Sequence, residues 1–416
     1  MKIAFTSFGC KVNQAETDKL ICSLPELNSE YIKNAAQADI LVVNTCAVTE
    51  KAQNDGEKYL KRLKNINPSL LIIATGCLAE LLKEKLKDRG ADVVIPNAEK
   101  DSIPQTIAYI IKKKQSADIA YRTVKAFSGA RTRAFLKIQD GCASFCAYCI
   151  IPFLRGTPHS KDIDTVYNEM TAFVRGGYKE IVLTGVHIGI YGKDAGGDIS
   201  LTTLLKRLIE IDGDYRIRLS SLDVHDITPE LISLVAESGN RICPHFHISL
   251  QSGSGEILLK MGRKYAPEAF ISATEAIRAA IPDACIGCDV ITGFPGESEK
   301  HFEETSSLLR RTELNYLHIF PYSKRPGTSA AKITGQLPAA VKKERADRLR
   351  ELGDEFRQKS AAAMTGKSVR VLSERGGKGH SDNFYMVRLP AGVAENTFFT
   401  ITVTGSGEGY MLEGEI

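Results

Sequence analysis

Residues 134–149 of the chain are AFLKIQDGCASFCAYC, an apolar run typical of a strand, followed at once by three cysteines. These cysteines, Cys142, Cys146 and Cys149, have the spacing C-x3-C-x2-C. Three thiolates on one loop can hold three irons of a [4Fe–4S] cluster and leave the fourth iron open for a small molecule. Structural zinc is the alternative, but zinc usually takes four protein ligands, and the nearest further candidate, His159, is ten residues away. The loop therefore favours an iron–sulfur cluster with an open iron.

Beyond this loop, segments typical of strands and helices alternate, which predicts a parallel sheet. Strands are expected at Ala134–Gln139, Glu180–Thr184, Arg216–Ser220, His245–Leu250, Ala284–Thr292 and Asn315–Pro321. Helices are expected between them, for example at Asp164–Arg175, Pro229–Glu237 and Pro267–Ala279. The block spans about 190 residues, fewer than the roughly 250 of a barrel with eight units. The prediction for residues 134–335 is therefore an open, partial (β/α)6 barrel.

The first 115 residues show the same alternation, with strands expected at Lys2–Ser7, Asp39–Asn44 and Leu70–Thr75. Each strand leads into a cysteine, in the sequences FTSFGC, LVVNTC and IIATGC, which end at Cys10, Cys46 and Cys77. In a parallel sheet these strand ends share one edge, so the three thiols could converge there. They could also be unrelated buried cysteines, since free cysteine is often buried. Their identical placement favours a doubly wound sheet domain over residues 1–115 with a second three-cysteine cluster.

The remaining segments divide into a linker, a helix and a small β domain. Residues 116–133 belong to a polar, basic stretch that predicts a linker between domains. Residues 336–366 contain a charged helix, expected at Ala340–Ser360. From residue 367 to 416, apolar and polar residues alternate between glycine-rich turns, which predicts a small all-β barrel. The chain as a whole is predicted to be an α/β protein with these three domains.

Composition and charge limit the class of protein. With 416 residues the chain is long enough for about two to four domains, and 43% hydrophobic with 25% charged residues exclude a disordered or collagen-like chain. No apolar run approaches the roughly 20 residues of a membrane span, and Lys11 follows the first strand too soon for a signal peptide. We therefore expect a cytoplasmic protein with no membrane partner, whose ten cysteines stay reduced. The net charge of +4 indicates little about partners, and no obligate protein partner is evident.

Two further motifs have weaker signals for a metal. Cys285 and Cys288 resemble a metal-binding pair, but residues three apart on a strand point to opposite faces, so we interpret them as structural. His245 and His247 share one face of an expected strand and could hold a metal. Because the sequence places no carboxylate near them, a polar lining of the barrel is favoured.

In these motifs the sequence resembles the radical S-adenosylmethionine (SAM) methylthiotransferases, over nearly the whole chain. The spacing C-x3-C-x2-C is typical of the radical SAM superfamily, and its combination with Cys10, Cys46 and Cys77 is typical of methylthiotransferases. The sequences GCKVNQ (9–14), NTCAVT (44–49) and QDGC (139–142) are similar to the group that acts on threonylcarbamoyladenosine beside the tRNA anticodon. The resemblance implies insertion of a methylthio group at C2 of that nucleoside, with a second SAM as methyl donor. The alternatives are the same chemistry on isopentenyladenosine or on a ribosomal-protein aspartate, and an RNA-binding protein with structural zinc.

The resemblance also implies cofactors and partners. They are two [4Fe–4S] clusters, SAM, a tRNA substrate and an electron donor such as flavodoxin or ferredoxin. SAM would bind the open iron beside Cys142, Cys146 and Cys149 and be cleaved there to a 5′-deoxyadenosyl radical. The cluster on Cys10, Cys46 and Cys77 would carry the sulfur.

Supporting residues also follow from the resemblance. Tyr148 is similar to the aromatic residue that meets the SAM adenine, and Thr184–Gly185 to the turn that receives the methionyl end. Gln251, Ser252 and Gly293 look like further parts of the SAM pocket, although each could be a turn residue without a ligand. The C-terminal barrel resembles a TRAM domain, for which a basic RNA-binding surface is expected. Residues 361–416 hold only five Lys and Arg against six Asp and Glu, so RNA binding is expected to draw also on the basic linker and the helix Ala340–Ser360.

Overall fold

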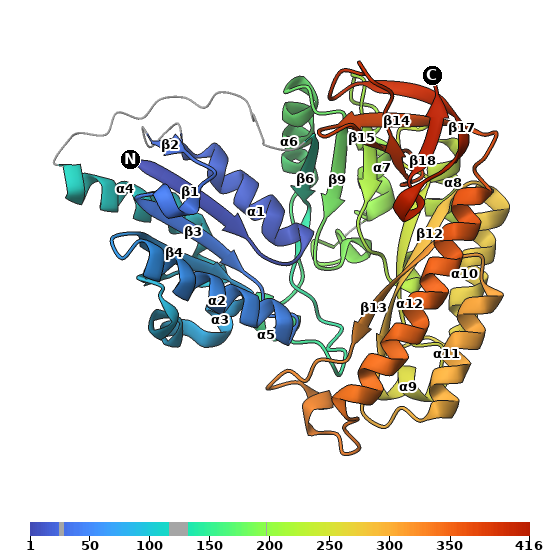
Figure 1. The fold of residues 1–416 in the computed structure, drawn as a ribbon, viewed down its shortest axis with the longest axis horizontal. Coiled ribbons are helices and arrows are strands. Elements are labelled where there is room, and N and C mark those ends of the chain that lie inside the picture. The colour runs from blue at the N-terminus through green and yellow to red at the C-terminus, as the bar shows by residue number, and fades with distance from the viewer. Residues whose placement is uncertain (25–28, 116–131, 197) are drawn as a thin grey trace.

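The computed structural model describes residues 1–24, 29–115, 132–196 and 198–416. The described chain forms an N-terminal α/β unit, a partial barrel and a small closed β barrel, which follow one another along the chain (Figure 1). The linker predicted at 116–133 lies outside the described residues except for its last two. Among the described helices, none is both long and apolar enough to cross a membrane.

The N-terminal unit is a parallel sheet with helices on both faces. Its strand order is β2–β1–β3–β4–β5, with β1 (Lys2–Ser7), β2 (Glu30–Tyr31), β3 (Ile40–Thr45), β4 (Leu71–Gly76) and β5 (Val93–Val94). Its helices are α1 (Lys11–Cys22), α2 (Glu50–Ile66), α3 (Cys77–Leu82) and α4 (Ile103–Gln115). Apolar residues on one face of the strands pack against α2 and α3, and those on the other face pack against α1 and α4. This arrangement confirms the predicted doubly wound sheet.

The register of this sheet aligns the ends of three strands. Ser7 of β1 lies opposite Asn44 of β3, which in turn lies opposite Thr75 of β4. The residues that follow these strands therefore emerge side by side at the carboxyl edge of the sheet.

In the part of the chain that the structure describes, the central unit is an open barrel of six parallel strands. They are β6 (Arg133–Lys137), β9 (Glu180–Thr184), β10 (Arg216–Leu219), β11 (His245–Gln251), β12 (Cys285–Thr292) and β13 (Tyr316–Pro321). Hydrogen bonds join β6–β9–β10 and β11–β12–β13 into two sheets, and isolated parallel bridges such as Leu222–Ile248 connect them. The helices are α5 (Ile151–Arg155), α6 (Ile163–Arg175), α7 (Leu201–Leu208), α8 (Pro229–Glu237), α9 (Gly255–Lys260), α10 (Pro267–Ala280), α11 (Glu299–Arg311) and α12 (Ala339–Ala362). This order confirms the predicted partial (β/α)6 barrel.

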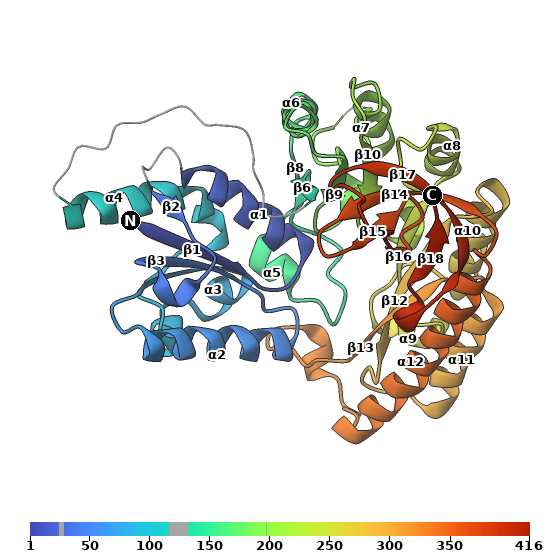
Figure 2. The same cartoon turned by 45° about the horizontal axis from the view of Figure 1, so that its top comes forward.

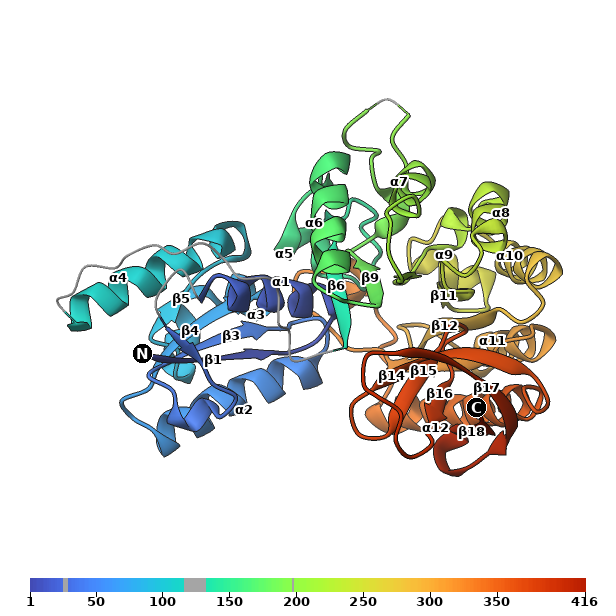
Figure 3. The same ribbon diagram turned by 90° about the horizontal axis from the view of Figure 1, so that it is seen from above.

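The strand expected at Ala134–Gln139 is divided in two. β6 ends at Lys137, and β7 (Gln139–Asp140) pairs antiparallel with β8 (His159–Ser160). Between them, Ile138 donates its backbone N–H to Thr184 and accepts the N–H of Lys161. The change of partner turns the chain out of the barrel and into the cysteine loop. The N-terminal unit lies beside this first strand, where α1 packs against β6 (Figure 3).

Alternate residues of the barrel strands point to opposite sides. Outward-facing residues such as Leu183 and Leu219 join one large apolar core with the surrounding helices. The inward-facing residues are mostly polar and include Glu180, Arg216, Arg218, His245, His247, Asp289 and Tyr316. Arg216 and Arg218 are fully buried and both pair with Glu180 of the neighbouring strand. The interior of the barrel is therefore polar.

The C-terminal unit is a closed barrel with strand order β14–β15–β16–β18–β17, which confirms the predicted small β barrel. Its strands are β14 (Ser368–Glu374), β15 (Lys378–Ser381), β16 (Met386–Arg388), β17 (Phe398–Ser406) and β18 (Leu412–Glu415). The segment 380–384 contacts the central barrel at the end where its strands begin (Figure 2). There Arg216 and Arg218 donate hydrogen bonds to backbone carbonyls of this segment, and Phe384 stacks on His245 with 4.3 Å between the ring centroids.

Candidate functional site

The cysteine loop between β7 and α5 is held by backbone hydrogen bonds. Cys142 donates its N–H to the carbonyl of Gly156 at 3.1 Å, and Cys149 donates to the carbonyl of Cys146 at 2.9 Å. Gly141, just before the loop, has a φ of +69°, and a Cβ there would collide with the backbone that follows α5. Only glycine suits this approach to the loop.

Cationic side chains lie beside the thiols of this loop. Burial opposes ionisation of Cys142, but hydrogen bonds, first among them one from His187, lower the pKa of this thiol. Arg263 donates from a guanidinium nitrogen 3.6 Å from Sγ of Cys146. Burial raises the pKa of the Cys149 thiol to about 12. The loop thus presents three sulfur ligands next to positive charge, which suits an anionic iron–sulfur cluster.

Cys10, Cys46 and Cys77 lie together at the carboxyl edge of the N-terminal sheet. Cys10 precedes α1, Cys46 follows β3 and Cys77 begins α3. At Gly9, where φ is +88°, a Cβ would lie 2.5 Å from Sγ of Cys46. Burial raises the pKa of Cys46 to about 11, and the neighbouring thiols of Cys77 and Cys10 contribute to the rise. The structure therefore brings together the three cysteines whose convergence the sequence predicts.

The number of thiols favours a cluster over a single structural metal ion. Each set supplies three free cysteines, either Cys142, Cys146 and Cys149 or Cys10, Cys46 and Cys77. Structural zinc usually takes four protein ligands, whereas three thiolates can hold a [4Fe–4S] cluster and leave one iron open. Both donor sets therefore fit such clusters.

Residues predicted to bind SAM lie next to this loop. Tyr148 packs against an apolar cluster that includes Met261 and Phe294. Thr184 is buried at the carboxyl end of β9, and Gly185 follows it. A Cβ at Gly185 would lie 2.9 Å from the carbonyl oxygen of the first residue of β7, so the turn after β9 packs closely against the approach to the loop.

Gln251, Ser252 and Gly293 lie at the same end of the barrel. Gln251 ends β11 with a φ of +69°, which is uncommon for a residue other than glycine. Ser252 is buried, and Gly293 follows β12 and donates its N–H to Glu297 at 2.9 Å. A Cβ at Gly293 would lie 2.5 Å from the side chain of Lys342 on α12. Helix packing by itself therefore requires glycine at position 293.

Sequence reasoning missed several buried oxygens at this end of the barrel. Ser220, Asp223 and Ser254 each keep a buried side-chain oxygen that has no hydrogen-bond partner among the described residues. The other oxygen of Asp223 pairs with Arg263 at 2.7 Å. Orphaned oxygens so close to the cysteine loop are candidates to bind the polar groups of SAM. Their signal in the sequence was their place in the turns that follow strands β10 and β11.

One side chain connects the two cysteine sets. Arg155, at the end of α5, is buried and donates to Asp140 at 2.9 Å, to Glu16 at 3.0 Å and to Asn13 at 2.7 Å. Burial raises the pKa of the Cys77 thiol, and the positive charge of Arg155 opposes this rise. Asp140 lies just before the cysteine loop, whereas the other partners belong to the N-terminal unit. Arg155 therefore fixes the two units against each other.

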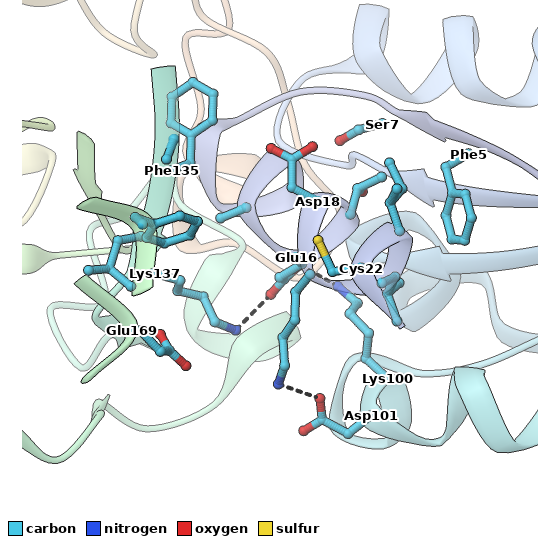
Figure 4. A pocket seen from close by; sticks show the side chains of 18 of the residues that line it. Phe5, Ser7, Glu16, Asp18, Cys22, Lys100, Asp101, Phe135, Lys137 and Glu169 are labelled. Atoms are coloured by element: carbon cyan, nitrogen blue, oxygen red, sulfur yellow. Dashed lines mark hydrogen bonds and ion pairs between the residues drawn. The ribbon is translucent and has the colours of Figure 1, made fainter. Parts of the chain in front are cut away.

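A network of charges extends from this contact along α1. Glu16 also accepts from Lys100 at 2.5 Å and from Lys137 at 2.9 Å (Figure 4). Burial opposes ionisation of Glu16, but Lys100 and Arg155 hold the pKa of its carboxyl well below its ordinary value. A cavity of about 1,090 Å³ borders the network between α1 and β6 (Figure 4). None of the six predicted cluster ligands lines it.

Basic residues expected to bind RNA are engaged within the protein. Arg133, at the end of the predicted linker, lies 3.4 Å from Glu374. On α12, Arg345 pairs with Glu297 at 2.6 Å, and Arg348 is surrounded by glutamates. These guanidinium groups therefore contribute less positive charge to the surface than the sequence suggests.

The structure also supplies the carboxylate that the sequence did not place near His247. Asp289 of β12 lies 2.8 Å from Nε2 of His247, although the two residues are far apart in the chain. His318 of β13 lies beside the same carboxylate. The expectation that no carboxylate is near these histidines is therefore wrong, because strand pairing in the barrel brings it there.

The barrel and its cysteine loop define a radical SAM enzyme. The family model of the Radical SAM superfamily matches residues 136–309, and that of the uncharacterized protein family UPF0004 matches residues 2–96. The fold is similar to that of the radical S-adenosylmethionine methyltransferase TsrM from Kitasatospora setae, with a TM-score of 0.59 and 13% identity over 79% of this chain and 76% of that chain.

Curated relatives define the family more narrowly. The threonylcarbamoyladenosine tRNA methylthiotransferase MtaB of Aquifex aeolicus is 38% identical over 384 residues, which are 89% of this chain and 92% of the relative. The tRNA-2-methylthio-N(6)-dimethylallyladenosine synthase of Thermoanaerobacter pseudethanolicus is 36% identical over 88% of this chain and 81% of the relative. The chain belongs to the radical SAM tRNA methylthiotransferases. Its cofactors are accordingly a [4Fe–4S] cluster and SAM, and enzymes of the MtaB type carry a second cluster.

When bound, these cofactors supply radical chemistry at an unreactive aromatic C–H, which no side-chain base can provide. The chain contributes ligands and positive charge. Burial would lower the pKa of His187, but its contacts with Asp226 and Cys142 raise it to about 10. An imidazolium therefore faces Cys142 at neutral pH, while Arg263 faces Cys146. Both charges stabilise the thiolate form that binds iron.

Proposed function

We propose that the enzyme inserts a methylthio group at C2 of N6-threonylcarbamoyladenosine next to the tRNA anticodon, with a second SAM as methyl donor. The observation that best supports this substrate is the polar interior of the partial barrel, where Arg218, Asp289 and His318 lie. A threonylcarbamoyl group has a carboxylate, a hydroxyl and ureido N–H groups that such an interior can pair. An isopentenyl group would displace water from Asp289 and His318 without replacing the hydrogen bonds of that water, which opposes binding. The similarity to MtaB relatives supports the same substrate.

On this proposal the two cysteine sets have separate tasks. Cys142, Cys146 and Cys149 hold the cluster that binds SAM, and Cys10, Cys46 and Cys77 hold the cluster that carries the sulfur. The SAM pocket is lined by Tyr148, Thr184, Gly185, Gln251, Ser252 and Gly293. Their common place at the carboxyl ends of the barrel strands, beside the cysteine loop, supports this assignment. A small one-electron donor such as flavodoxin or ferredoxin supplies the reducing electron.

We also propose domain boundaries that lie near the ends of secondary-structure elements. The N-terminal domain covers 1–115, the partial barrel 134–335, the connecting helix 336–366 and the TRAM-like barrel 367–416. In support, α4 ends at Gln115, α12 begins at Ala339 and β14 begins at Ser368.

Nucleoside analysis tests the substrate. The reconstituted enzyme, SAM and a reductant are incubated with anticodon stem-loop RNAs that carry either threonylcarbamoyladenosine or isopentenyladenosine. We expect methylthiolated product only from the first RNA, and with SAM labelled in its methyl group the product should carry the label. Product from the isopentenyladenosine RNA alone would refute the proposed substrate, and unlabelled product would refute the methyl donor.

A further inference from the structure

The interior of the partial barrel holds a polar cluster that includes none of the residues predicted to bind the iron–sulfur clusters or SAM. We call it the interior cluster, and it consists of His245, His247, Asp289, Tyr316 and His318. The Tyr316 hydroxyl lies 2.9 Å from Nε2 of His245 and 2.9 Å from Nδ1 of His247. Nε2 of His247 lies 2.8 Å from Asp289, and Nδ1 of His318 lies 3.5 Å from the same carboxylate oxygen. Strands β11, β12 and β13 thus share a continuous chain of polar groups.

The interior cluster is accessible at one end only. His245 and Tyr316 are buried, and Phe384 of the C-terminal barrel stacks on His245. By contrast, the side chain of His318 is 49% exposed and that of Asp289 is 20% exposed. A ligand can therefore reach Asp289 and His318 but not the buried end.

Lys11 adds a cation to the same region. It begins α1 directly after Cys10, and α1 packs against the barrel strands β6 and β9. The ammonium group of Lys11 lies within electrostatic reach of Arg218 and Arg133 and of the carboxylates of Glu180 and Asp289. Glu180 is already paired with Arg218 at 2.8 Å and with a second arginine. Among the described residues, the ammonium group of Lys11 makes no hydrogen bond or ion pair. A half-buried cation without an anion of its own favours a ligand that brings one.

We propose that Lys11 binds the carboxylate of the threonylcarbamoyl group, and that Asp289 and His318 bind its hydroxyl and ureido N–H. The inference rests on the proposed substrate and names the residues that select it. C2 and the N6 substituent flank N1 on the same edge of adenine. A base that presents C2 to a cluster at Cys10 therefore directs its N6 group toward the neighbouring Lys11.

A divalent metal is the competing ligand for the interior cluster. Atoms of His247, Asp289 and His318 that can bind metal lie within 4.8 Å of one another, and two histidines with one carboxylate are a known ligand set for iron. The ammonium group of Lys11 opposes this, because it would repel a cation bound at Asp289. An organic anion with hydroxyl and N–H groups suits both residues, because its negative charge can pair with Lys11 and its hydroxyl and N–H groups can donate to Asp289.

The test uses stem-loop RNAs whose target base carries either the threonylcarbamoyl group or its uncharged carboxamide. Dissociation constants are measured with the reconstituted holoenzyme. The wild type should bind the carboxylate RNA about 10- to 100-fold more tightly than the carboxamide RNA, and this preference should vanish in Lys11→Met. Lys19→Met is the matched control on α1, where the exposed lysine pairs with Asp101, and it should keep the wild-type ratio.

The outcomes separate this inference from the proposed function. A wild type that forms product from the threonylcarbamoyl RNA, with an unchanged binding ratio in Lys11→Met, would overturn the inference and leave the function standing. A wild type that forms no product from that RNA would refute the function itself.

Because Lys11 adjoins Cys10, iron analysis must show that Lys11→Met still assembles its clusters. If Lys11→Met does not assemble its clusters, Asp289→Asn provides the test instead. Its binding of the threonylcarbamoyl RNA is compared with its binding of an RNA that carries a glycylcarbamoyl group, which lacks the hydroxyl. The wild type should prefer the threonylcarbamoyl RNA about 10-fold, and Asp289→Asn should show a clearly smaller preference, because its neutral amide oxygen accepts a weaker hydrogen bond than a carboxylate. Equal preference in both proteins, or a stoichiometric zinc or extra iron that Asp289→Asn loses, would overturn the inference.

Discussion

Replacing Arg155 by methionine tests how the two cysteine sets are held in position. Methionine fills much of the same space but removes the charge and the hydrogen bonds to Asn13, Glu16 and Asp140. Removing one partner of a buried ion pair costs about 3–5 kcal/mol, and the side chain of Arg155 is only 2% exposed. Glu16 and Asp140 both keep Lys137 as a partner, at 2.9 and 3.1 Å. We therefore expect the lower end of that range, about 3 kcal/mol.

The loss should appear where the N-terminal unit meets the barrel, because Arg155 connects them. A decrease of about 3 kcal/mol raises the population of the opened interface by roughly 150-fold. Amide hydrogen exchange in α1 and β6, which pack against each other, should accelerate by up to that factor. Exchange in the C-terminal strands, such as β17, should stay as in the wild type. Mass spectrometry of the anaerobically reconstituted enzyme measures both regions in one experiment.

Arg350→Met is the control for loss of an exposed arginine. Arg350 lies on α12 and pairs with Asp347 at 2.5 Å, and such exposed pairs contribute about 0–1 kcal/mol. Arg155→Lys keeps the charge but not the planar fork of donors, so its effect should lie between wild type and Arg155→Met. If exchange in α1 of Arg155→Met stays within about twofold of the wild type, a change of under 0.5 kcal/mol, Arg155 does not hold the interface.

Three further predictions concern the cysteines and a buried carboxylate. Cys146→Ala removes a thiolate from the loop, so cleavage of SAM to 5′-deoxyadenosine should vanish even with dithionite; continued cleavage would show that Cys146 is no ligand. Cys46→Ala should still cleave SAM, because the loop cysteines lie on a separate unit, but should make no methylthiolated nucleoside; normal product would make Cys46 a core cysteine. Burial raises the pKa of Glu16, but the charges of Lys100 and Arg155 bring this pKa well below its ordinary value. The ion pairs of Glu16 therefore stabilise the folded protein above about pH 4.3, the pKa of the unfolded state. This stability is lost as the pH falls through the lower pKa of the folded state. Glu16→Gln should therefore be less stable at pH 7 and lose less stability on acidification in urea unfolding, and an unchanged pH dependence would exclude Glu16 as its source.

The fold and the cysteine sets could be predicted because their signals are local. A β-rich run that leads into Cys46 or Cys77 fixes both the strand and the position of the thiol at its end. Parallel pairing then places all such ends at one edge. The same logic placed Thr184 and Gln251 at the carboxyl end of the barrel. Boundaries shifted by a residue or two where, as at Ile138, a backbone group changes its partner.

The remaining features depend on how distant segments dock. Arg155 and Glu16 are 139 positions apart, and nothing near either residue indicates that they meet. His247 and Asp289 are 42 positions apart, so the carboxylate beside the histidine becomes visible only when β11 and β12 pair. Buried ion pairs of this kind arise from the tertiary arrangement, whereas hydrophobic periodicity reports only which face of an element is buried.

Helix α1 explains how these distant contacts serve one site. Cys10 precedes the helix and Lys11 begins it, so a predicted cluster ligand and a predicted substrate contact are neighbours in the chain. Asn13 and Glu16, one turn apart on the same face, both accept hydrogen bonds from Arg155. Asn13 also donates to the backbone just before two of the cysteines of this unit. Because a helix is rigid over so short a length, α1 and its contact with Arg155 set the distance between Cys10, the barrel interior and the cysteine loop.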